Sequence, residues 1–71
     1  MNKYEIGTIV KFSNGKSYGV SLDTEFEGKK YVCLATTTEP LEILFAEVTG
    51  DKLRVIRERE EKERVFLMFA K

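Results

Sequence analysis

The feature that most constrains this fold is an Asn14-Gly15 pair between two stretches in which apolar and polar residues alternate. Alternation places apolar side chains on one face of a β-strand, and Asn-Gly is a strong hairpin signal. A two-residue loop would put the apolar sets of the two strands on opposite faces. A three-residue loop, residues 13–15, instead pairs Val10 with Tyr18 and puts both apolar sets on one face. We predict the longer loop, with Gly15 in the left-handed conformation.

The same argument predicts a second hairpin, with a three-residue loop at residues 26–28. The pairs that follow from this register are Leu22–Val32, Val20–Leu34 and Glu25–Lys29. The next strand, residues 30–36, is apolar on both sides, which is typical of a central strand or of one with a second layer packed on it.

The segment after Pro40 fits two structures. Apolar residues at 41, 44, 45 and 48 have helical spacing, whereas residues 43–48 also fit a short buried strand. The chain from Arg57 to its end has no Gly, Pro, Asn or Asp, and two acid-before-base pairs at i,i+4 precede an apolar arc. This pattern predicts a C-terminal helix, although no Ser, Thr, Asp or Asn stands at its start to cap it.

Several motifs extend over nearly the whole chain: Lys16-Ser17-Tyr18, residues 27–34, Glu39-Pro40, residues 45–48 and Met68-Phe69-Ala70-Lys71. Together they resemble a group of short proteins of unknown function from Firmicutes-type bacteria. The resemblance implies an antiparallel meander followed by one C-terminal helix, which favours a strand at residues 41–48. It implies no activity, because the shared motifs are structural.

We therefore expect one domain, residues 1–71, of the mainly-β (α+β) class. It is a five-stranded antiparallel meander, curled or small-barrel-like, with the C-terminal helix packed on its inner face. The expected elements are strands at residues 6–12, 17–25, 29–36, 42–48 and 52–56, and a helix at 58–70. In this arrangement Val20, Leu22 and Leu34 face inward, and Ile9, Tyr31 and Cys33 lie on the outer face.

The residue inventory argues against catalysis. The chain has no His, so Ser–His and Cys–His nucleophile pairs are excluded. The single Cys33 allows neither an internal disulfide nor a multi-cysteine zinc site. The five glycines match no phosphate-binding loop, and no acidic calcium loop is present. We expect no enzymatic activity, no catalytic residues, no cofactor and no metal.

Charge argues against nucleic acid as a partner. Twelve Lys and Arg residues balance twelve Asp and Glu residues, so the net charge of zero gives little attraction for phosphate. The RNA-binding strand pattern is matched only by Lys16, Tyr18 and Gly19. The alternative function is a small nucleic-acid-binding β-barrel. It requires an exposed Tyr beside the convergent lysines Lys11, Lys16, Lys29 and Lys30.

The expected setting is the cytoplasm. The longest apolar run, Val65–Ala70, is too short to span a membrane, and the N-terminal residues lack the apolar core of a signal peptide. A lone cysteine fits a reducing compartment. The leading hypothesis is a non-catalytic protein-interaction or accessory module that binds another protein or weakly self-associates. Its candidate surface is Ile9, Tyr31 and Cys33, with Tyr31 as the anchor.

Overall fold

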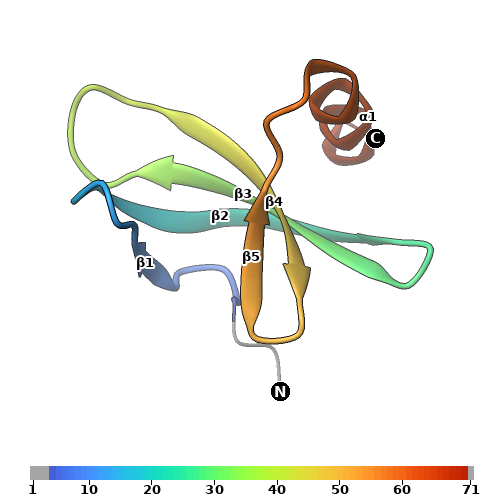
Figure 1. Cartoon of the computed structure of the whole chain (residues 1–71), viewed down its shortest axis with the longest axis horizontal. Helices are drawn as coiled ribbons and strands as arrows, with labels where there is room; N and C mark the ends of the chain where they lie inside the picture. Colours follow the sequence, from blue (N-terminus) through green and yellow to red (C-terminus); the bar gives the residue numbers. More distant parts are fainter. Residues whose placement is uncertain (1–3, 71) are drawn as a thin grey trace.

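The computed structural model describes residues 4–70, which form a curled sheet with one helix on it (Figure 1). The elements are β1 (Ile9–Lys11), β2 (Ser17–Phe26), β3 (Lys29–Thr36), β4 (Ile43–Thr49), β5 (Lys52–Val55) and α1 (Arg59–Phe69). The strands are antiparallel and lie in the order β1-β2-β3-β4-β5. No pairing joins β1 to β5 within the described residues, so the sheet is an open half-barrel. The predicted meander with a C-terminal helix is confirmed.

Most strand bounds lie within one residue of the expected ones, but β1 begins three residues later than predicted. Residues 5–8 form a turn instead, in which the amide of Thr8 donates to the carbonyl of Glu5 at 3.0 Å. Gly7 in this turn has a φ of 98°, a left-handed conformation that favours glycine. Residues 1–3 and 71 of the expected domain lie outside the described residues.

The ambiguous segment after Pro40 is a strand, β4. Its two faces are both covered: Leu44 and Ala46 pack against the inner core, and Phe45 packs against α1. A strand buried on both sides needs apolar residues in succession, and such a run also contains helical spacings by coincidence. The favoured prediction, a strand, is confirmed.

The first hairpin has the predicted register. Val10 pairs with Tyr18, and the amide of Phe12 donates to the carbonyl of Lys16 at 2.9 Å. Gly15 has a φ of 87°, and its amide donates back to the carbonyl of Phe12 at 3.0 Å. The three-residue loop therefore brings both apolar sets onto the inner face, as the alternation requires.

The second hairpin has a shorter loop than predicted. Phe26 pairs with Lys29, so only Glu27 and Gly28 connect β2 to β3. Both have a positive φ, 52° and 77°, as a type I′ turn requires. The predicted pairing of Glu25 with Lys29 is wrong, because Glu25 pairs with Lys30.

A β-bulge at Ser21 compensates for the shorter loop. Leu22 pairs with Cys33 and Val20 pairs with Leu34, so Ser21 is an extra residue in β2. The predicted Val20–Leu34 pair is therefore correct, whereas the predicted Leu22–Val32 pair is wrong. The bulge also moves Leu22 to the outer face, where its side chain is exposed.

Glu27→Asn is expected to raise the free energy of unfolding by about 0.5–1 kcal/mol, because Asn tolerates the left-handed conformation better than Glu does. Urea denaturation of the two proteins measures the difference. The matched control is Glu25→Asn two residues earlier in β2, where Asn is a poor strand former and no gain is expected. Equal or lower stability of the Glu27 variant would contradict the turn assignment.

The inner face of the sheet holds the main core. Its buried residues are Tyr18, Val20, Val32, Leu34 and Ala46. Side chains from the periphery complete it: Tyr4, Phe12, Leu44, Val48 and Leu53. The Tyr4 hydroxyl donates to the carbonyl of Asp51 at 2.9 Å, which ties the N-terminal segment to the β4–β5 turn.

The helix lies on the outer face, and the prediction that it covers the inner face is wrong. Val65 of α1 forms a second buried cluster with Tyr31 and Ile56, and Phe45 packs against it. The inner face leaves no site for a helix, because the curled sheet fills it with side chains from β2 to β5 and with Phe12. Figure 1 shows α1 and β1 on opposite sides of strands β2 to β4.

Candidate functional site

The three residues of the predicted surface do not share one environment. Ile9 is 60% exposed, whereas Tyr31 is 7% and Cys33 is 8% exposed. Tyr31 lies beneath α1 beside Val65, so it cannot anchor a partner. The prediction is therefore wrong for Tyr31 and Cys33, because α1 occupies the face that was expected to be free.

Half of the outer face remains uncovered by α1. One cross-strand row runs through Ile9, Gly19, Ala35 and Ile43, and the next row runs through Leu22, Cys33 and Phe45. The side chains of Ile9, Leu22 and Ile43 are each about half or more exposed. We call Ile9, Gly19, Leu22, Ala35 and Ile43 the open half of the outer face. It is an apolar surface with small residues at its centre.

The apolar surface continues from the sheet onto one flank of α1. Phe45 follows Ile43 on the same face of β4, and its ring meets the ring of Phe66 edge-on, with centroids 6.3 Å apart. Phe66 is 56% exposed. A shallow hollow of about 360 Å³ lies here, lined by Phe45, Lys62, Glu63, Phe66 and Leu67. The open half of the sheet and this flank of α1 therefore form two adjoining sides of one apolar surface.

Sequence reasoning missed Ile43, Leu22 and Phe66 as surface residues. Alternation could place Ile43 on the outer face, but whether it is covered depends on where α1 lies. Leu22 reaches this face only through the bulge at Ser21. Phe66 belongs to the apolar arc that predicts the buried side of the helix, but only Val65 of α1 is buried.

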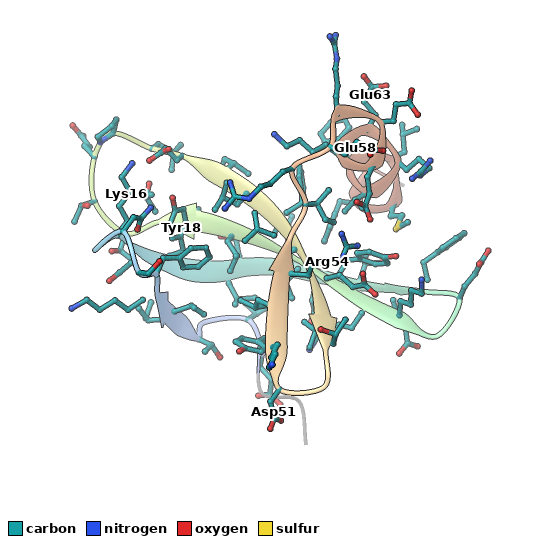
Figure 2. The ribbon with its side chains drawn as sticks, viewed as in Figure 1. Lys16, Tyr18, Asp51, Arg54, Glu58 and Glu63 are labelled. Atoms are coloured by element: carbon teal, nitrogen blue, oxygen red, sulfur yellow. The ribbon has the colours of Figure 1, made fainter. Side chains whose placement is uncertain are left out.

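A charged cluster fixes α1 to the edge of the sheet. Nη2 of Arg54 in β5 lies 2.6 Å from Oε1 of Glu47 and 2.6 Å from Oε2 of Glu61. Glu47 is only 8% exposed, so its carboxylate depends on this partner. Figure 2 shows Arg54 between β5 and the helix, while Glu63 points away from the sheet. A sequence signal for this pair is the Gly50-Asp51 turn, because a two-residue loop there places Arg54 opposite Glu47.

The guanidinium of Arg54 lowers the pKa of Glu61 through hydrogen bonds and charge. A carboxyl whose pKa is lower in the folded state stabilises the fold above its unfolded pKa, about 4.3. That contribution is lost as the pH falls through the folded pKa.

Glu61→Gln is therefore expected to weaken the fold at neutral pH and to flatten the loss of stability below about pH 4.3. Urea denaturation across an acid pH series measures this loss. The control is Glu60→Gln, at an exposed position one residue earlier, which should keep the wild-type acid profile. If the free energy of unfolding depended on pH in the same way for the wild type and Glu61→Gln, the proposed link between the Glu61 pKa and stability would be wrong.

The basic residues do not converge beside an exposed tyrosine. Lys16 is paired with Glu42, and Nζ of Lys30 lies 3.8 Å from Oδ2 of Asp23. Lys16 precedes β2 beside the end of β3, whereas Lys30 lies near the start of β3, so the two are about 23 Å apart, the length of an eight-residue strand. Tyr18 and Tyr31 are both buried.

The described residues offer little reactive chemistry. Burial raises the pKa of the Cys33 thiol, which disfavours the nucleophilic thiolate. Between residues 4 and 70, no three His, Cys, Asp or Glu side chains are grouped so that they could hold a metal ion. Within the same range, no helix has the length and apolar character that crossing a membrane requires. The chain matches no protein family, no curated protein and no solved structure.

Proposed function

We propose that this chain is a small, non-catalytic, cytoplasmic protein-interaction or accessory module, related to the Firmicutes-type bacterial proteins that its motifs resemble. The observation that supports it is the open half of the outer face, continued by Phe66 on α1. Exposed apolar surface of this extent, rimmed by polar residues, is characteristic of protein interfaces. A partner that covers Ile9, Leu22 and Ile43 removes this surface from water.

The alternative function, binding of nucleic acid, has weaker support. It needs a convergent basic surface with an exposed aromatic platform. Lys16 and Lys30 instead face carboxylates at opposite ends of β3, and the chain has no net charge. The apolar surface therefore favours a protein as the partner.

The proposal is tested by affinity capture from native cytoplasm, with and without nuclease. Ile43→Lys places a charge on the open half and should abolish capture of the protein partner. The matched pair for the helix is Phe66→Lys and Phe26→Lys. Phe26 is also exposed but lies with Arg64, Leu67 and Met68 in a second hollow, which meets the Phe66 hollow only at Leu67, so Phe66→Lys should reduce capture much more than Phe26→Lys.

Two outcomes would count against parts of this proposal. One is capture that survives both Ile43→Lys and Phe66→Lys, which would overturn the open half as the binding surface, because the partner would then bind elsewhere. The other is capture that disappears on nuclease treatment, because the partner would then be nucleic acid. Urea denaturation of each variant confirms that the fold is intact.

A further inference from the structure

Leu41 is an apolar side chain presented to solvent by a well-anchored loop. It is 70% exposed and lies between β3 and β4. The Thr36 hydroxyl donates to the carbonyl of Pro40 at 3.1 Å and accepts from the amide of Glu42 at 2.9 Å. Glu42 is also paired with Lys16. The loop therefore holds Leu41 in place, which lowers the entropy cost of burying it against a partner.

The loop and the flank of α1 carry opposite charges beside their apolar residues. Leu41 stands between Glu39 and Glu42; because Glu42 is paired with Lys16, Glu39 supplies the net negative charge of the loop. On α1, Arg59 and Lys62 share a flank with Phe66, because their spacings of three and four residues keep them on one side of the helix. Glu63 also lines the hollow and is paired with Arg59 at 3.6 Å, so Lys62 supplies the net positive charge of this flank beside the apolar hollow. One chain thus carries both halves of a contact.

The geometry of the layers lets two copies make this contact at the same time. The loop and α1 lie toward opposite ends of the outer face (Figure 1). Packed sheets lie about 10 Å apart, which is close to the diameter of a helix. A second sheet packed on the open half would therefore lie in the same layer as α1. A two-fold axis running across the strands brings the loop of each copy against α1 of the other.

The residues of the open half suit such packing. The sheet curls around its inner core, so the outer face is convex. At the centre of the row, the Ile9 side chain extends over Gly19, with its Cδ1 3.5 Å from where a Cβ would lie, and the small side chain of Ala35 lets the two convex faces approach. Ile9 and Ile43 lie at the ends of the row, where the faces diverge and larger side chains fill the space.

We propose that two copies of this chain form a two-fold symmetric dimer through their open halves, with Leu41 of each copy in the hollow beside Phe66 of the other. This inference rests on the proposed function and names the partner. The apolar side chains that it buries are Ile9, Leu22, Leu41, Ile43, Phe66 and Leu67. Their exposed area is roughly 500 Å², somewhat over half of the 800 Å² per partner of a standard interface, so the dimer is weak.

Sedimentation equilibrium of the pure chain tests the dimer from low micromolar to millimolar concentration. The wild type should show a reversible monomer–dimer equilibrium. Leu41→Lys and Ile43→Lys should each raise the dissociation constant at least about tenfold. Both side chains are exposed in the monomer, so urea denaturation should give near wild-type stability. Phe26→Lys is the control and should weaken the dimer much less, because Phe26 adjoins the interface only through Leu67.

Charge reversal tests the predicted contact between the loop and α1. Glu39→Lys and Lys62→Glu should each weaken the dimer, because each places like charges across the interface. The double variant should restore it. Each copy then carries both substitutions, so a basic loop meets an acidic α1 flank at both contacts of the dimer. Added salt should shrink these differences. A double variant as weak as the single ones would overturn this contact and with it the proposed arrangement.

Other outcomes separate this inference from the proposed function. A chain that stays monomeric throughout, while Ile43→Lys loses capture of a different protein, overturns the dimer and leaves the interaction module standing. A dimer unaffected by Leu41→Lys and Ile43→Lys overturns the assigned surface. A monomeric chain that captures nothing overturns both proposals.

Discussion

Removing residues 58–71 is expected to abolish cooperative unfolding of the chain. The helix contributes Val65, which is 1% exposed, and it covers Tyr31 and Ile56 on the outer face of the sheet. Exposing Tyr31, Phe45 and Ile56 costs about 2 kcal/mol each. A chain of this length is stable by only about 4–10 kcal/mol, so the truncated sheet should not stay folded.

Circular dichroism during urea denaturation distinguishes a cooperative transition from a gradual one. Two point variants of the full chain calibrate the result. Val65→Ala removes buried methyl groups and should cost about 2 kcal/mol, whereas Leu67→Ala at an exposed position should change little. If the truncated chain unfolded cooperatively at the urea concentration of the full chain, α1 would be an appendage rather than part of the core.

Arg54→Met is expected to lower the free energy of unfolding by about 2 kcal/mol. The substitution keeps an apolar stem but removes the charge that pairs with Glu47 and Glu61. Glu47 is almost fully buried, so its carboxylate would be left without its cation. The effect stays below that of a fully buried pair because the Arg54 side chain is half exposed.

The double variant Glu47→Met/Arg54→Met should recover more than half of this loss, because no buried charge then remains unpaired. Urea denaturation of the wild type, the two single variants and the double variant gives the coupling energy. Arg57→Met, at an exposed position after β5, is the control for removing a positive charge. An Arg54→Met variant as stable as Arg57→Met would show that the cluster contributes nothing.

Sequence reasoning succeeded where a pattern allows only one solution. The alternation on both sides of Asn14-Gly15 is satisfied by a single loop length, so the Val10–Tyr18 register could be predicted. The inner core residues Val20, Val32 and Leu34 follow from the same alternation. The strand at residues 43–49 required the resemblance, because its apolar residues fit two periodicities.

The second hairpin could not be predicted in detail, because two one-residue changes cancel each other. A loop shorter by one residue and a bulge at Ser21 leave the Val20–Leu34 pair unchanged. They shift every residue pair between the bulge and the turn by one position. The type I′ turn also lacks its usual sequence signal. Glu27 stands where Asn, Asp or Gly is normal.

The candidate site depended on the position of α1, which no local pattern specifies. The apolar residues on both sides of β3 indicate a second layer, whereas the expected helix on the inner face predicts that Tyr31 and Cys33 are exposed. Only the three-dimensional structure shows that the inner face is already full and that α1 must take the other. Ile9 remained exposed because it lies beyond the reach of the helix.

The order of the strands also sets how fast this chain folds. Each strand pairs only with its neighbour in sequence, so the sheet forms by closing short loops, and we expect it to fold faster than a β-sandwich of equal length. Docking of α1 on Tyr31 and Phe45 joins residues that are distant in sequence, so we expect it to come late in folding. Val65→Ala should therefore speed unfolding and leave the folding rate nearly unchanged.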